Sequence, residues 1–131
     1  MSDKSTISKA FNVHFFEFMD DILRIFPENE DIKHTRTALE LFKKANPTSI
    51  IKAWHKYVFV PYNDVISLGD ITFFIEKDYK ADLNNLSNSD EIMKAIDRIR
   101  DPVRNMNPEN REHSTKYIQN LCKLSNVYMT M

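Results

Sequence analysis

Glycine is nearly absent from this sequence. The 131 residues include one glycine, Gly69, where a soluble protein of this length carries about nine at average usage. Glycine supplies the positive backbone φ angles that tight hairpins, phosphate-binding loops and nucleophile elbows require. We therefore predict a chain of helices joined by Asn, Pro and Ser turns, with little capacity for the chemistry that glycine-rich loops carry.

Cysteine, net charge and long apolar runs are also scarce. The lone Cys122 excludes an intramolecular disulfide framework, which predicts a reducing compartment, cytosolic or nuclear. The 18 Lys and Arg residues balance 19 Asp and Glu residues, so no net charge attracts nucleic acid or an anionic membrane at long range. No apolar stretch reaches the roughly 18–20 residues of a membrane span, and no basic start followed by an apolar run indicates a secretion signal.

Apolar residues recur at helical spacing along most of the chain. This pattern predicts an all-α fold, a compact single-domain bundle of about five to seven helices over 1–131. It places the first three helices at 5–26, 30–45 and 47–60. The apolar stripe of the first helix comprises Ile7, Phe11, Phe15, Phe18, Ile22 and Ile25.

Proline and asparagine mark the expected helix boundaries. Pro27 disfavours the α conformation at the residue before it and ends the first helix. Asn46 followed by Pro47 has the residue types of an N-cap and a first helical position. Pro61 is expected to break or kink the third helix, which leaves a short helix or an irregular segment over 61–68.

Gly69 stands just beyond that segment, where a glycine commonly closes a helix. We therefore predict a left-handed conformation with positive φ at Gly69. Residues 71–75 have the strongest β propensity in the chain. Because they have no evident strand partner and an isolated strand is unstable, we favour a short buried helix over 70–80.

The C-terminal third of the chain repeats the same boundary signals. The polar segment 81–88 indicates a loop, and Asn88 with Glu91 has the spacing of a capping box. A helix follows and ends near residue 102. Asn107 with Pro108 then forms a second cap-plus-proline signal, which starts the last helix.

The sequence contains no pattern typical of catalysis or of a metal or cofactor site. None of the four histidines lies three or four positions from another, and Cys122 falls on the apolar side of the last helix, where burial is the usual outcome. In 90–105, basic residues alternate with acidic ones at pairing distance, as in Asp97 with Arg100 and Asp101 with Arg104. We predict no enzymatic activity, no metal and no cofactor, and nucleic-acid binding is disfavoured.

Aromatic residues are in surplus between positions 54 and 79, and the chain ends in an uncharged run, 128–131. Exposed aromatic and methionine side chains commonly anchor protein contacts. The alternative is that most of the aromatics form the core. The candidate interaction residues are Trp54, Tyr57, Phe59, Tyr62, Phe73, Phe74, Tyr79, Tyr128, Met129 and Met131.

Several short motifs share their order and spacing with a known family. They are Phe11-Asn12, the run from Phe18 to Ile22, Phe26-Pro27, Asn46-Pro47, and the closing run Tyr117-Ile118, Leu121, Leu124-Ser125. Over roughly 11–125 the chain thereby resembles small helical proteins encoded by nucleocytoplasmic large DNA viruses. Many relatives carry a tryptophan near Met106, where this chain departs from the pattern. The resemblance supplies no catalytic signature.

The resemblance implies a viral origin, a location in the infected-cell cytoplasm or the virion, and incorporation into the particle. We therefore predict a structural or protein-interaction component, such as a minor capsid or virion-associated protein, whose partners are viral structural proteins. Two alternatives stay open. One is a soluble viral regulatory module that binds a host or viral protein, and the other, less favoured, is a nucleic-acid-associated factor.

Overall fold

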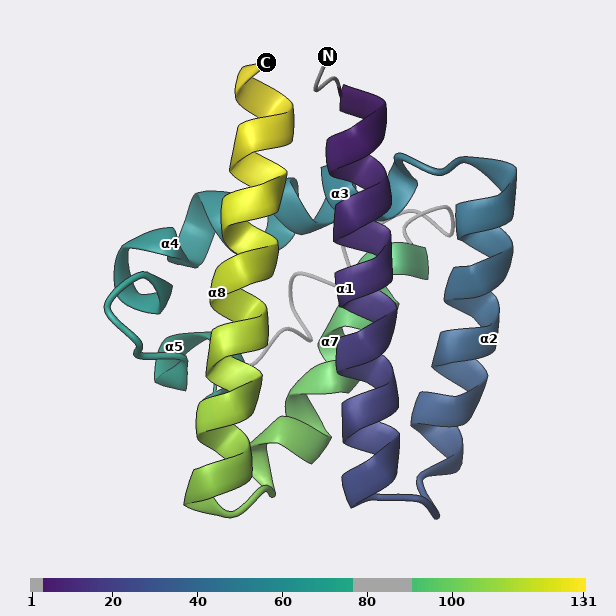
Figure 1. The fold of residues 1–131 in the computed structure, drawn as a ribbon. Helices are drawn as coiled ribbons and strands as arrows, with labels where there is room; N and C mark the ends of the chain where they lie inside the picture. Colours follow the sequence, from purple (N-terminus) through teal and green to yellow (C-terminus); the bar gives the residue numbers. More distant parts are fainter. Residues whose placement is uncertain (1–3, 77–90) are drawn as a thin grey trace.

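Three long helices form one layer of the protein (Figure 1). They are α1 (Lys4–Ile25), α2 (Glu30–Ala45) and α8 (Pro108–Thr130). Helix α1 lies between the other two and runs antiparallel to both. Its contact with α8 is the most extensive between any two of the described elements. This computed structural model describes residues 4–76 and 91–131.

A second layer crosses behind the long helices. Its first part is a continuous helical run made of α3 (Ser49–Trp54), the π-helical turn η1 (His55–Phe59) and α4 (Val60–Ile66). The short helix α5 (Thr72–Glu76) and the helix α7 (Glu91–Arg104) complete the layer. The all-α, single-domain bundle predicted from the sequence is therefore confirmed.

The core is built around the buried face of α1. Phe11 and Phe15 are fully buried and meet the indole ring of Trp54 edge-on, with centroid distances of 6.3 and 6.0 Å. Such edge-to-face pairs stabilise the core beyond the area that they bury. The other fully buried residues of α1 are Phe18, Met19 and Ile22. The helical spacing read from the sequence therefore identified the inward face of α1 correctly.

Pro61 is accommodated by the π-helical turn. A proline inside a helix lacks the N–H that would bond one turn back, and its ring collides with the carbonyl there. In η1 the helix widens, so that the Val60 N–H donates to the His55 carbonyl five residues earlier. The helix continues through α4. Of the two outcomes predicted for 61–68, the short helix is therefore the one found.

Gly69 ends α4 in the predicted left-handed conformation, with φ of 87°. Its N–H donates to the Ile66 carbonyl at 2.9 Å, and the Asp70 N–H donates to the Val65 carbonyl at 3.0 Å. These two bonds are those of a Schellman motif. Beyond them α5 is helical at Thr72–Glu76, as predicted in preference to a strand, and the remainder of the expected 70–80 helix lies outside the described residues.

The asparagine signals are correct at one boundary and wrong at another. Asn107 caps α8, and its Oδ1 accepts from the Asn110 N–H at 2.9 Å. At Asn46 the prediction of an N-cap is wrong, because α3 begins only at Ser49. The Asn46 N–H still donates to α2, at the Phe42 carbonyl, and its Oδ1 accepts from Thr48 in a tight turn. The capping box expected at 88–91 lies largely outside the described residues.

The geometry at Gly69 predicts the effect of substituting it. A Cβ there would meet only the Gln119 amide nitrogen, at 3.9 Å, so the cost comes from the backbone conformation. We expect Gly69→Ala to lower the free energy of unfolding by about 1 kcal/mol, measured by urea denaturation. Gly69→Asn should lower the free energy of unfolding by less than Gly69→Ala, because asparagine tolerates the left-handed conformation better than alanine. Equal stability of all three proteins would contradict the left-handed cap.

Candidate protein-interaction surfaces

Three of the ten candidate interaction residues are core residues. Trp54 is fully buried, and Tyr62 and Tyr128 retain only small exposed fractions. Trp54 fills the space between α3 and α1 through its contacts with Phe11 and Phe15. The prediction that these three side chains lie on an interaction surface is therefore wrong, because a buried ring has no area left to offer a partner.

Two further aromatic candidates are half-buried on η1. Phe59 stacks on the imidazole of His55, with centroids 4.9 Å apart. The ammonium group of Lys56 lies 5.1 Å from the centre of the Tyr57 ring. Both rings thus contact neighbours on the same turn and remain partly exposed. The side chains of Phe73 and Phe74, and the whole of Tyr79, lie outside the described residues.

The C-terminal end of α8 carries the most exposed of the candidate residues whose side chains the structure describes. Met129 and Met131 are 44% and 49% exposed, and Val127, which the sequence reasoning missed, is 45% exposed. Past Lys123 no residue of this helix is charged. A useful signal for Val127 is its position four residues before Met131, which places both on one helix face. Met129 comes two residues after Val127 and therefore lies on another side of the helix. We call this end of the chain, with its three exposed apolar side chains, the α8 end.

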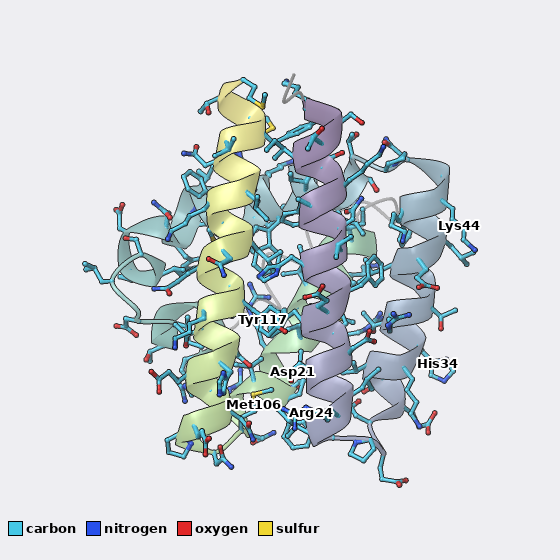
Figure 2. All side chains as sticks on the ribbon, viewed as in Figure 1. Asp21, Arg24, His34, Lys44, Met106 and Tyr117 are labelled. Atoms are coloured by element: carbon cyan, nitrogen blue, oxygen red, sulfur yellow. The ribbon has the colours of Figure 1, made fainter. Side chains whose placement is uncertain are left out.

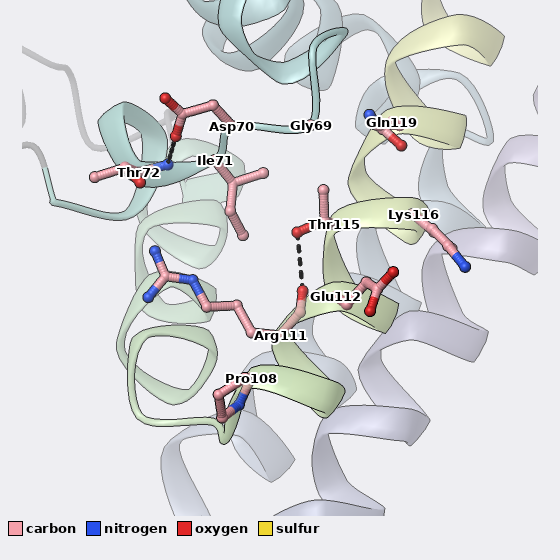
Figure 3. A pocket seen from close by; sticks show the side chains of 10 residues that line it. All are labelled: Gly69, Asp70, Ile71, Thr72, Pro108, Arg111, Glu112, Thr115, Lys116 and Gln119. Atoms are coloured by element: carbon pink, nitrogen blue, oxygen red, sulfur yellow. Dashed lines mark hydrogen bonds between the residues drawn. The ribbon is translucent and has the colours of Figure 1, made fainter.

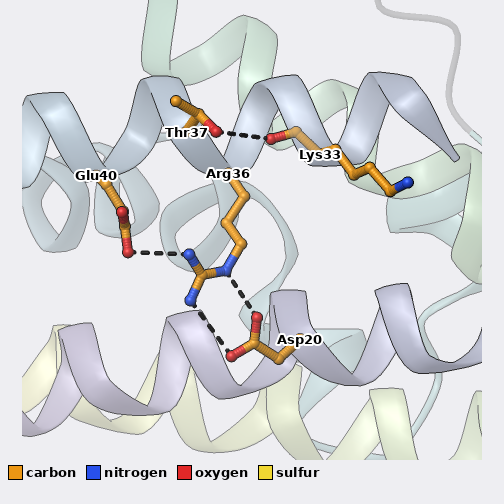
Figure 4. Close-up of polar contacts among 5 residues, drawn as sticks. All are labelled: Asp20, Lys33, Arg36, Thr37 and Glu40. Atoms are coloured by element: carbon orange, nitrogen blue, oxygen red, sulfur yellow. Dashed lines mark hydrogen bonds and ion pairs between the residues drawn. The ribbon is translucent and has the colours of Figure 1, made fainter. Parts of the chain in front are cut away.

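A groove between α1 and α2 is the second candidate surface, with a volume of about 690 Å³. Its apolar floor is formed by Val13 and Phe16 of α1. Arg36 of α2 bridges the groove, donating to Asp20 of α1 at 2.7 and 3.3 Å and to Glu40 at 2.9 Å (Figure 4). These charge-assisted bonds raise the pKa of Arg36 and fix the spacing of the two helices.

A second hollow lies between the Gly69 turn and the first half of α8 (Figure 3). Its volume is about 420 Å³. The carboxyl group of Asp70 accepts from the Thr72 N–H at 2.9 Å, and this bond, aided by Arg111, lowers the pKa of Asp70. Asp70 and Glu112 offset Arg111 and Lys116 within the lining. The hollow therefore has no excess of one charge that would select a ligand.

The titratable side chains that the structure describes form no metal-binding cluster, and the one cysteine is buried. Within the described residues, no three His, Cys, Asp or Glu side chains gather closely enough to hold a metal ion. Cys122 is buried as predicted, and burial raises the pKa of its thiol to about 11, while a hydrogen bond from Trp54 acts in the opposite direction. A thiol of this kind is a poor nucleophile at neutral pH.

His14 lies at the seam between α1 and α8. Its ring is 4.8 Å from the ring of Tyr117, which stacks in turn on Phe18 at 5.3 Å. Figure 2 shows Tyr117 between the two helices. Burial lowers the pKa of His14 below its usual value of 6.5, against an opposing effect of Glu17. The neutral imidazole is therefore the form that suits the folded seam.

The comparisons with known proteins leave the family assignment open. No protein-family model matches the chain, and neither a curated protein nor a solved structure gives a significant match. The resemblance to small proteins of large DNA viruses therefore stays a prediction. In the part of the chain that the structure describes, no helix is both long enough and apolar enough to cross a membrane.

The environment of His14 predicts a loss of stability in mild acid. The unfolded chain, with a pKa near 6.5, takes up a proton before the folded protein does, so the free energy of unfolding falls as pH drops from 7 towards 5. His55, whose pKa burial also lowers, acts in the same direction. We expect His14→Gln to reduce this pH dependence in urea denaturation series.

The matched control is His34→Gln, which replaces an exposed histidine on α2. It makes the same replacement at an exposed position, so the comparison of its slope with that of His14→Gln isolates the effect of the site between α1 and α8. The readout is the slope of stability against pH, so a general loss of packing at His14 does not affect it. A His14→Gln protein with the same slope as the wild type would contradict the assignment.

Proposed function

We propose that the protein is a protein-interaction component of a large DNA virus, a minor capsid or virion-associated protein that works through helix-face contacts. The observation that carries the proposal is the α8 end, where Val127, Met129 and Met131 are each close to half exposed on a stretch without charge. The resemblance to small viral proteins supports the viral context. The absence of catalytic groupings among the described residues favours a role in binding.

The α8 end has the composition of a contact surface. Methionine is over-represented at interaction surfaces because its flexible, polarisable side chain adapts to the shape of a partner. Full burial of a Val or Met side chain contributes about 1.5–3 kcal/mol, so covering the exposed halves of the three contributes roughly half of that for each. Burial of these side chains against a partner therefore stabilises the complex, and the helix does not need to rearrange.

The direct test is mass spectrometry of purified particles of the virus that encodes the protein. The proposal predicts that the protein co-purifies with the particle at a constant ratio to known structural proteins. Its absence, under conditions that detect other minor components, would remove the virion assignment. A stable monomer that captures one host or viral protein from infected cells would instead support the regulatory module.

Substitutions at the α8 end predict a specific defect. We expect Met129→Asp combined with Met131→Asp to reduce incorporation into particles about tenfold or more, because each change places a charge in the contact. Both side chains are half exposed at the helix end, so the thermal midpoint should change little. The measurement is the amount of protein per particle, quantified by mass spectrometry.

Leu68→Asp is the matched control, since Leu68 is the most exposed large apolar residue among those described, at 84%, and lies away from the α8 end beside Gly69. It introduces one of the two carboxylates of the double variant, at an apolar position that is more exposed than either methionine. The control protein should be incorporated normally. Equal incorporation of the wild type, the control and the double variant would show that the α8 end is not the contact.

A further inference from the structure

We infer that the groove between α1 and α2 binds an amphipathic helix of a partner protein, one that pairs an apolar stripe with acidic residues. The inference rests on the proposed function in one respect, namely that the protein acts by contacting other proteins. It adds a second surface, separate from the α8 end, and the chemistry of what occupies it.

The shape of the groove fits a helix. Its walls are the antiparallel helices α1 and α2, and its lining residues on α1 run from Lys9 to Asp20 at spacings of one helical turn. At 1.5 Å per residue this is about 16 Å, or three turns. A helix laid between two antiparallel helices packs its ridges into their grooves and extends the bundle.

The floor of the groove is apolar and held in place. Val13 is 61% exposed, although it lies near the middle of α1 and lines the groove towards α2. Phe16 beside it is nearly buried, and its ring is flanked by Arg36 at 5.3 Å and by Lys43 at 4.8 Å. Cation–π contacts of this kind orient the ring. The floor thus offers a partner an apolar strip that needs no rearrangement.

The charges along the groove select an acidic partner. Arg36 is neutralised by Asp20 and Glu40, to which it donates hydrogen bonds. The remaining basic lining residues are Lys9, Lys43 and Lys44. None of the three forms an ion pair with a described carboxylate, and Glu17 is the one acidic lining residue outside the Arg36 network. These three lysines, of which Lys43 also contacts the Phe16 ring, therefore have no carboxylate partner among the described residues and attract carboxylates on a bound helix.

The positions of these lysines also give the bound helix a direction. Lys9, Lys43 and Lys44 lie near the end of the groove that Pro47 closes, where the Asn12 side-chain amide donates to the Pro47 carbonyl at 2.8 Å. Glu17 and Asp20 lie about two and three turns further along α1 than Lys9. The acidic residues of the partner therefore face the Pro47 end, and its apolar residues lie over Val13 and Phe16.

The test is a selection for binding partners of defined chemistry. The probe is a phage-displayed library of helix-forming peptides of about five turns, with the residues of one face and its flanks randomised. The wild-type protein is the target. We expect enriched peptides to combine apolar residues three and four positions apart with Asp or Glu beside them. Enrichment of neutral or basic peptides, or no enrichment, would overturn the inference.

Affinities of the enriched peptides then locate the site. Measured by fluorescence anisotropy, binding should weaken about tenfold or more for Val13→Glu and for the double variant Lys43→Glu, Lys44→Glu. Lys52→Glu, an exposed lysine on α3, and Leu68→Asp are the matched controls and should bind like the wild type. Circular dichroism and urea denaturation verify that every variant is folded. Equal binding by the wild type and both groove variants would contradict the site.

The outcomes separate this inference from the proposed function. Acidic peptides that bind the groove of a protein absent from virus particles would retain the groove and reject the virion role. If the protein is present in particles but its groove selects no acidic helix, the virion role is retained and the groove inference is rejected.

Discussion

Burial of one face of α1 is the constraint on which the rest of the structure depends. Phe11, Phe15 and Phe18 are fully buried, and burying each such ring contributes about 1.5–3 kcal/mol. No single neighbour covers this face, so α8, α2 and α3 each contact part of it. The arrangement of these helices also determines which residues of α1 stay exposed. Val13 remains exposed to solvent, and α1 forms one wall of the groove between α1 and α2.

Local signals determined much of the fold. Helical spacing located α1 and α2 to within a residue or two. The residue types at positions 107 and 69 predicted a helix cap and a left-handed turn, because both features depend on short-range hydrogen bonds. The local sequence did not predict how the chain accommodates Pro61 or which role Asn46 takes, and the reason is physical. A proline's lost hydrogen bond is absorbed by widening the helix in η1, and the choice between turn and cap at Asn46 depends on how α2 meets α3.

The candidate surfaces were harder to predict, because exposure is a property of neighbours. Trp54 and Met129 are both large and apolar, yet the first is enclosed by α1 and the second has no helix over it. The uncharged end of α8 gave a usable signal, and it identified Met129 and Met131. The sequence contained no signal for the groove. Phe16 and Lys43 are 27 positions apart in sequence and come into contact only when α1 and α2 pack side by side.

The central claim is that this protein works by presenting helix faces to other proteins of a virus particle. Cross-linking mass spectrometry on intact, purified particles tests it most directly, because lysines stand beside both surfaces. The account predicts cross-links to other particle proteins from Lys123, just before the α8 end, and from Lys9, Lys43 or Lys44 at the groove. Cross-links to particle proteins that arise only from lysines elsewhere, such as Lys52, would contradict it.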